Sequence, residues 1–179
     1  LIHEPARLAI LTVLSSVRTA AFVFLQRTTG LTQGNLSSHL TKLEDAGLIA
    51  SLVAAFNEKR EPGIIRMHRL RAIRAGRYAH VDAHLIVPEY WTVDAAHDAL
   101  DAFEKRVIER CKIEGEIVFH TDPCRRALCP ACDVAECPIR LSTFTRCPPL
   151  TAEEARMTDE TFWGPRGYPL RNPMPTTAS

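Results

Sequence analysis

Side chains that bind transition metals are concentrated in one stretch of this sequence, between His68 and Cys137. The stretch holds five of the seven histidines and four cysteines with the spacing C-x4-C-x2-C-x4-C. Imidazole nitrogen, thiolate sulfur and carboxylate oxygen are ligands of zinc, which usually takes four of them at once. Because ligands that share an ion must meet in space, this density restricts the chain to folds that gather these side chains.

The sequence pattern changes twice along the chain and predicts an α+β architecture. Residues 1–50 show only the helical spacing of apolar residues. Residues 51–122 mix helical and strand-like patterns in the order α-β-β-α-β, which is typical of an open, ferredoxin-like sandwich. Residues 123–179 are rich in proline, cysteine and threonine, and we expect roughly the last eight to be disordered. We therefore predict a three-helix head, a ferredoxin-like domain and an irregular Cys-rich tail.

Periodicity and turn residues place the individual elements. The head is expected to contain helices over 6–17, 20–28 and 33–46, the last of them capped by Thr32 and ended by Gly47. The second region is expected to contain a helix over 52–59, strands over 64–73 and 78–87 joined by a hairpin at Gly76, a helix from Thr92 or Asp94 to Cys111, and a strand over 116–120.

The last two helices of the head are joined by a short turn that contains Gly30. This is the helix-turn-helix pattern, in which the second helix enters the major groove of DNA. Its exposed face would carry polar side chains that can reach base edges and phosphates. These candidate DNA-binding residues are Gln33, Asn35, Ser37, Ser38, His39 and Lys42.

The histidines of the second region fall on predicted strands with a regular spacing. Side chains alternate along a strand, so His80, Asp82 and His84 share one face of the strand over 78–87. The remaining candidate metal ligands lie on the other elements of this region: His68, His97, His120 and Asp122. A ferredoxin-like sandwich could gather these groups at one edge, and we expect them to bind zinc or a similar divalent ion.

A second candidate metal site follows the last predicted strand. Four thiols could close one tetrahedral zinc site: Cys124, Cys129, Cys132 and Cys137. The two-residue gap is standard for zinc, whereas the four-residue gaps are looser. Two disulfides, unliganded thiols and an iron–sulfur cluster remain open as alternatives. Cys111 and Cys147 are expected to be bystanders.

Several broad classes of protein find no support in the sequence. The opening residues lack the basic and apolar regions of a signal peptide, and no apolar run approaches the roughly 20 residues that a membrane helix needs. We therefore expect a cytoplasmic chain, although it opens on Leu1 rather than Met. No phosphate loop, dinucleotide fingerprint or activated nucleophile is evident. We do not expect an enzyme, although a zinc hydrolase stays open.

The head resembles winged-helix transcriptional regulators over about residues 1–50. The phrase Asn-Leu-Ser-x-His-Leu-x-x-Leu-Glu-x-Ala-Gly-Leu, at 35–48, is fairly specific to that group. Members of the family continue into a two-stranded basic wing, but residues 50–56 have a helical pattern here, so we expect the wing to be missing. The resemblance implies DNA binding; the alternative is a three-helix packing module without that role.

The segment over about residues 52–124 resembles the cytoplasmic C-terminal domain of the cation diffusion facilitator transporters. The resembling runs are His-Arg-Leu-Arg-Ala-Ile-Arg-Ala-Gly at 68–76, Val-Asp-Ala-His-Leu at 81–85, Thr-Val-Asp-Ala-Ala-His at 92–97 and Ile-Val-Phe-His-Thr-Asp-Pro at 117–123. The resemblance implies a homodimer that binds zinc-type ions near its interface. The positions that match the family's ligands are His68, His84, His97, His120 and Asp122.

These features together predict a cytosolic, dimerising, metal-responsive transcriptional regulator. Metal binding would change how two protomers sit together and therefore how two recognition helices are spaced on double-stranded DNA. One alternative is the cytoplasmic domain, or a fragment, of a cation diffusion facilitator with no DNA role. Another is a plain cytosolic metal-binding protein.

Overall fold

The computed structural model describes residues 4–17 and 19–163, and it divides the chain into two compact units, Leu1–Leu48 and Ile49–Ser179. The expected disorder at the C-terminus lies outside the described residues. Each unit has a core of its own. The α+β fold class predicted from the sequence is confirmed, with helices alone in the first unit and a sheet in the second.

The first unit is the predicted three-helix head. It contains α1 (Pro5–Ser16), α2 (Phe22–Thr29) and the beginning of α3 (Gln33–Lys59). One buried residue from each helix meets in the core: Ile10, Leu25 and Leu36. Gly30 ends α2 in the left-handed conformation, with φ of 70°, which costs glycine little. The Thr32 hydroxyl accepts a hydrogen bond from the Asn35 amide at 3.3 Å, as expected of an N-cap.

The predicted end of the third helix at Gly47 is wrong, because α3 continues to Lys59 as one helix of 27 residues. Glycine inside a helix costs about 1 kcal/mol. That cost is outweighed by the burial of Leu52 and Phe56 further along, which contributes roughly 1.5–3 kcal/mol for each side chain. Among the described residues no strand precedes Arg66, so no two-stranded wing lies between α3 and the β1–β2 hairpin.

The second unit is built on a three-stranded sheet with the order β1-β2-β3. Its elements are β1 (Arg66–Ala75), β2 (Tyr78–Val87), α4 (Val93–Cys111) and β3 (Glu114–Pro123), preceded by the end of α3. β1 and β2 are antiparallel, and β2 and β3 are parallel. Gly76, with φ of 64°, makes the turn between β1 and β2. This is the predicted αββαβ order.

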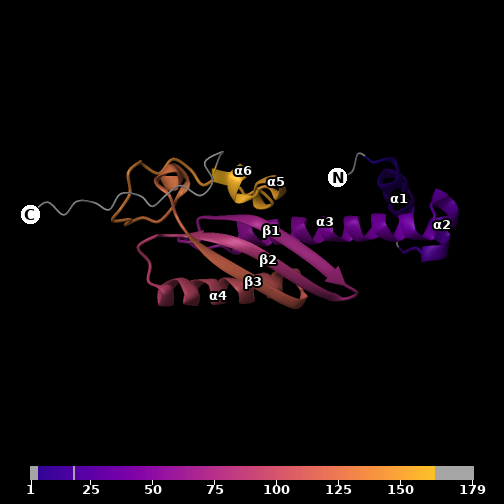
Figure 1. Ribbon diagram of the computed structural model, residues 1–179, viewed down its shortest axis with the longest axis horizontal. Coiled ribbons are helices and arrows are strands. Elements are labelled where there is room, and N and C mark those ends of the chain that lie inside the picture. Colours follow the sequence, from indigo (N-terminus) through magenta and orange to yellow (C-terminus); the bar gives the residue numbers. More distant parts are fainter. Residues whose placement is uncertain (1–3, 18, 164–179) are drawn as a thin grey trace, which may run out of the picture. The chain divides into compact units, whose positions relative to one another are not determined.

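The two faces of the sheet have different coverings. Alternate residues of β2 are buried on one face: Ala79, Val81, Ala83 and Leu85. On this side Phe103 of α4 packs against Phe56 of α3 at 5.9 Å and against Phe119 of β3 at 5.5 Å between ring centroids. In Figure 1, α4 runs along this face. The other residues of β2, including His80 and His84, therefore face away from α4.

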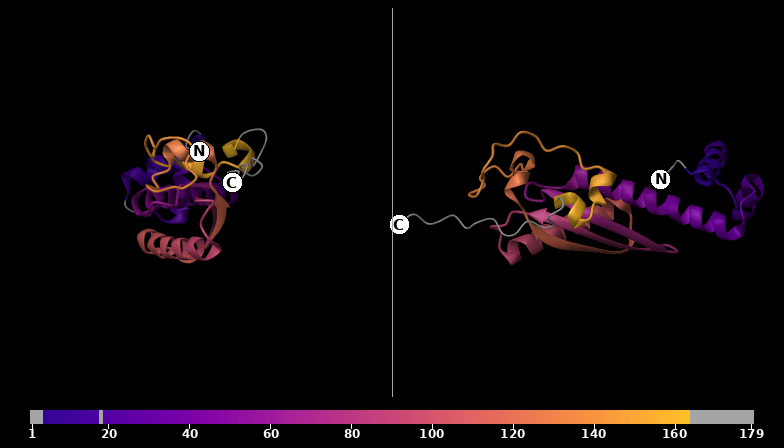
Figure 2. Two further views of the ribbon diagram at one scale, coloured as in Figure 1. Left: turned by 90° about the vertical axis from the view of Figure 1, so that its left-hand side faces the viewer. Right: turned by 45° about the horizontal axis from the view of Figure 1, so that its top comes forward.

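The opposite face is partly covered by residues 124–163, which we call the extension. It contains the short 3-10 helix η1 (Arg126–Ala131), α5 (Ala152–Ala155) and α6 (Asp159–Trp163), and no helix or strand is assigned between η1 and α5. Both views in Figure 2, like Figure 1, place the extension and α4 on opposite sides of the sheet. Cys124 and Cys132 of the extension pack with Ile65 and Ile86.

Polar side chains from α3 and β1 hold the extension in place. Arg66 is 4% exposed, and its guanidinium binds both carboxylate oxygens of Glu154 and donates to the carbonyl of Pro148 at 2.6 Å. The Asn57 amide donates to the Leu150 carbonyl at 3.0 Å and accepts from the Leu150 amide at 2.8 Å. Because these partners are buried or half-buried, the extension is an integral part of the second unit.

Candidate metal centre

Three histidines form one row across the sheet. His68 of β1 is paired in register with His84 of β2, and His84 is paired with His120 of β3. Paired residues on neighbouring strands point to the same face, so all three imidazoles lie on the side away from α4. The ring centroid of His84 is 5.4 Å from that of His68 and 4.9 Å from that of His120.

Asp122 connects two of these histidines. Its Oδ2 lies 2.8 Å from His68 Nε2 and 3.0 Å from His84 Nδ1. Burial raises the pKa of Asp122, but the hydrogen bonds with the two imidazoles outweigh this effect and hold the pKa below its usual value. The group is therefore a charged carboxylate between two imidazoles.

The donor set of this cluster fits a zinc-type ion. One ligand atom each from His68, His84 and Asp122 lies within 4.8 Å of the others, and among the described residues no other group of three metal-binding side chains does so. His68 is completely buried, whereas His84 and Asp122 are each 18% exposed. Two nitrogens and one oxygen would supply three of the four ligands that zinc usually takes. We call these three residues the sheet-face cluster.

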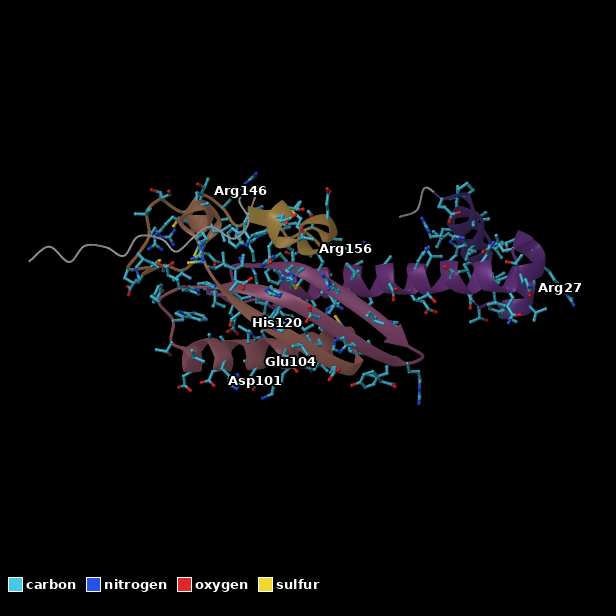
Figure 3. The ribbon with its side chains drawn as sticks, in the orientation of Figure 1. Arg27, Asp101, Glu104, His120, Arg146 and Arg156 are labelled. Carbon is cyan, nitrogen blue, oxygen red and sulfur yellow. The ribbon has the colours of Figure 1, made fainter. Side chains whose placement is uncertain are left out.

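His120 lies beside the sheet-face cluster but has a different carboxylate partner. Its Nε2 is 2.9 Å from Asp82 Oδ2, and its side chain is 49% exposed. Figure 3 labels it on the sheet. His80 is further along β2 and contacts Glu116 at 2.7 Å. The row of histidines therefore continues from the buried cluster to the solvent.

His97 is not brought to the sheet-face cluster. It is exposed on α4, which covers the other side of the sheet, and it lines an open groove of about 490 Å³ between α4 and β3. Asp101 and Glu104 of α4 line the same groove, and Figure 3 shows both on the side away from the extension. Burial, and then the charge of Asp101, raises the pKa of Glu104.

The four cysteines of the predicted second site all lie at the start of the extension, as free thiols. Within the described residues they do not form a group with three ligand atoms within 4.8 Å. The pKa of the Cys124 thiol and that of the Cys132 thiol are both raised, and burial is the largest cause. Their thiols also accept backbone hydrogen bonds, from Glu89 and from Val134.

The two cysteines that we expected to be bystanders have polar neighbours. Arg60, which also pairs with Asp133 at 2.8 Å, lies 2.7 Å from Cys147 Sγ. Cys111 Sγ lies 3.6 Å from the Ser51 hydroxyl. Both contacts join segments far apart in the sequence, which no local pattern could have indicated.

The candidate DNA-binding residues lie on the first turns of α3. Five of them are exposed: Gln33, Asn35, Ser37, Ser38 and Lys42. His39 differs, because its Nδ1 lies 3.0 Å from Glu4 Oε2 and its side chain is only 15% exposed. His39 therefore packs back toward the N-terminal end of α1.

The fold is that of a ferredoxin-like domain, and the sheet-face cluster gives it a candidate metal centre. Residues 49–124 match the family model of the cation efflux protein, cytoplasmic domain, and residues 6–80 match that of a winged helix DNA-binding domain. Both resemblances seen in the sequence are therefore matched by a family model. The two matches overlap over 49–80, where the structure has the end of α3 and the β1–β2 hairpin.

One similar protein is described as an uncharacterized transporter of Synechocystis sp., with 28% identity over 96 residues. The match covers 53% of this chain and 30% of the transporter, so the chain spans less than a third of that relative. Among the described residues, no helix is both long enough and apolar enough to cross a bilayer.

Several solved structures are similar to about 45% of this chain. The metal-bound C-terminal domain of the CzcD transporter from Thermotoga maritima is 20% identical, with a TM-score of 0.40, and the match covers 45% of this chain and 91% of that one. The copper form of the MamM C-terminal domain is 20% identical, with a TM-score of 0.41, over 45% and 86% of the two chains. CzrB, described as a putative zinc transporter, is 22% identical, with a TM-score of 0.35, and the match covers 46% of this chain and 94% of that one.

Proposed function

We propose that this protein binds a zinc-type divalent ion at the sheet-face cluster and acts as a metal-responsive, dimerising regulator. The observation that carries the proposal is the convergence of His68, His84 and Asp122, with ligand atoms within 4.8 Å of one another. Nitrogen and carboxylate donors in this proportion suit zinc. We propose a cytoplasmic location, because the family match is to a cytoplasmic domain, and no catalytic role.

The chemistry of such a centre is electrostatic: a bound divalent ion supplies two positive charges on a face where Asp122 is the half-buried anion. His68 and His84 hold Asp122 by hydrogen bonds, which keeps all three donors oriented toward one point. His120 lies next to them. His97 lies on the other side of the sheet, so it would bind an ion at a separate site. The cysteines at 124, 129, 132 and 137 are proposed as a second ion site.

Zinc binding tests this proposal directly. After dialysis against a weak chelator, the chain is expected to bind more than one equivalent of zinc in a calorimetric titration. The sheet-face cluster accounts for one equivalent and the cysteines for a second. A thiol-specific reagent added before the titration separates the two, because it blocks only the cysteine site. Less than one equivalent, in fresh and in metal-reconstituted protein, would contradict the proposal.

We propose that residues 52–122 pair two chains into a homodimer, as the resemblance implies, because one small domain of this length buries little core on its own. Light scattering at micromolar concentration is expected to give twice the mass of one 20.0 kDa chain. The measurement is made with zinc and with chelator. A clean monomer with zinc present would rule out the dimeric regulator.

The finer part of the proposal concerns residues 1–50. It takes residues 51–122 as the metal-binding dimerisation domain and residues 123–179 as the Cys-rich, irregular C-terminal region. We propose that the exposed side of α3 binds double-stranded DNA, supported by the helix-turn-helix arrangement and the winged-helix match. Two recognition helices in a dimer read half-sites about 34 Å apart for each turn of DNA. A rotation of the dimer on metal binding would change that spacing, with a coupling of typically 1–3 kcal/mol.

Lys42→Ala is expected to weaken binding to all duplexes alike and to reduce the slope of log affinity against log salt by about 1, because a phosphate contact releases a counterion. Asn35→Ala is expected to cost roughly 1–3 kcal/mol on the selected sequence alone, if that amide reads a base edge. Lys105→Ala is the matched control, since this exposed lysine lies on α4 and pairs with Asp101.

The second candidate function is that of a cytoplasmic piece of a cation efflux transporter with no DNA role. It is favoured by the match over 49–124 and by the transporter of Synechocystis, of which this chain spans 30%. Selection from genomic fragments with and without zinc separates the two. If no fragment is enriched and affinity for random duplex does not depend on salt, the regulator is excluded and the transport-related function stands.

A further inference from the structure

The first step of the argument is an irregularity in β1 next to His68. The pairing with β2 shifts register between His68 and Arg71, and Arg69 has a φ of 53°. The left-handed region costs a non-glycine residue roughly 1–2 kcal/mol, so such a bulge persists only where other contacts compensate. Here the Arg69 amide donates to the Met157 carbonyl at 3.0 Å, and its guanidinium donates to Asp159 at 2.8 Å. The bulge therefore binds the start of α6.

The second step is the placement of Asp159 against the buried imidazole. His68 has its Nε2 on Asp122, and its Nδ1 lies 3.5 Å from Asp159 Oδ1. Both of these facing atoms are buried and have no hydrogen-bond partner within the normal limit. Nδ1 of His68 is fully buried and faces a carboxylate oxygen. A hydrogen bond between the two is favoured, because a buried polar atom without a partner costs free energy.

The third step is that α6 covers the same ring. Phe162 stacks on His68 with centroids 4.8 Å apart and planes at 22°, and Trp163 meets the ring edge-on at 6.1 Å. Asp159, Phe162 and Trp163 all come after residue 124, where the match to the efflux domain ends. They are therefore a feature of this chain's own extension.

We propose that Asp159 is a positioning residue of the metal centre, and that zinc binding and the docking of α6 are coupled. An imidazole that gives its Nε2 lone pair to an ion carries its proton on Nδ1, and a carboxylate that accepts a hydrogen bond from this N–H orients the ring and raises its basicity. Asp159 is placed to do this for His68. Because coupling is reciprocal, the ion stabilises α6 on the sheet, and α6 stabilises the ion. The inference rests on the proposed sheet-face site.

The test compares Asp159→Asn with two control variants in the full chain. Zinc affinity of Asp159→Asn is expected to fall 10- to 100-fold, the usual effect of losing such a partner. Glu160→Gln removes the same charge from the next, exposed position of α6 and is expected to bind zinc like the wild type. Arg69→Gln removes the anchor but keeps the carboxylate, so its affinity is expected to fall less than that of Asp159→Asn.

Hydrogen exchange supplies a readout that affinity alone does not give. Zinc is expected to slow amide exchange over residues 151–163 in the wild type, and this protection is expected to disappear in Asp159→Asn. Equal affinity losses in Asp159→Asn and Arg69→Gln, or wild-type exchange that does not respond to zinc, would overturn the inference. If the wild type binds no zinc at the sheet face, the proposed function itself fails. If zinc binds there and Asp159→Asn leaves its affinity unchanged, the inference alone fails.

Discussion

His84→Ala is expected to lower the zinc affinity of the sheet-face cluster by more than about 100-fold. Loss of a residue that only hydrogen-bonds to a metal ligand typically costs 10–100-fold, and this substitution removes a ligand itself. Asp122 would keep only its contact with His68, so two protein donors would remain. Calorimetric titration against a competing chelator measures the loss, and one equivalent of zinc is expected to disappear while the cysteine-bound equivalent stays.

His80→Ala provides the matched control for this experiment. His80 lies on the same strand and faces the same side as His84, but it is exposed and contacts Glu116 instead of Asp122. The zinc affinity of the His80→Ala protein is expected to stay within about twofold of the wild type, since surface substitutions away from the site have small effects. Equal behaviour of the two variants would show that the sheet-face cluster is not the binding site.

Gly115→Ala is expected to destabilise the second unit by about 3 kcal/mol or more. Gly115 has a φ of 152°, and a Cβ at this position would lie 1.8 Å from the carbonyl oxygen of Ala79. Ala79 and Gly115 are paired in the parallel ladder between β2 and β3, so the two strands would have to separate. Urea unfolding followed by far-UV circular dichroism is the measurement.

Gly47→Ala is the control, and it is expected to act in the opposite direction. Gly47 lies inside α3, and a Cβ there would meet nothing within 4 Å. Alanine is expected to stabilise the chain by roughly 0.5–1 kcal/mol, because it favours the helix and reduces the freedom of the unfolded chain. A Gly115→Ala protein that unfolds at the wild-type urea concentration would contradict the close approach of β2 and β3.

The sheet and one side of the candidate site could be predicted from the sequence because a strand has a period of two. The strand predicted over 78–87 matches β2 (Tyr78–Val87), and alternation alone assigned His80, Asp82 and His84 to a common face. The third strand was predicted too short, at 116–120 against Glu114–Pro123. Gly115 and Pro123 are poor strand residues, and pairing with β2 overrides that preference.

What the sequence could not predict depends on contacts between distant segments. The helical end at Gly47 is a local expectation that the burial of Leu52 and Phe56 overrides. Likewise, α6 has five residues, too few for a periodic pattern, so nothing local marks Asp159 as a neighbour of His68. Their separation of 91 positions makes the contact visible only in the folded chain.

The anchoring of the extension has a consequence for how this protein can be divided into fragments. A fragment cut at residue 124, where the efflux-domain match ends, would keep Arg66 and Asn57 but lose Glu154, Pro148 and Leu150, which bind them. A guanidinium left in a buried position without its carboxylate typically costs 3–5 kcal/mol, and Ile86 would lose its apolar cover as well. The cooperative folding unit is therefore expected to be longer than the segment that matches the efflux-domain model.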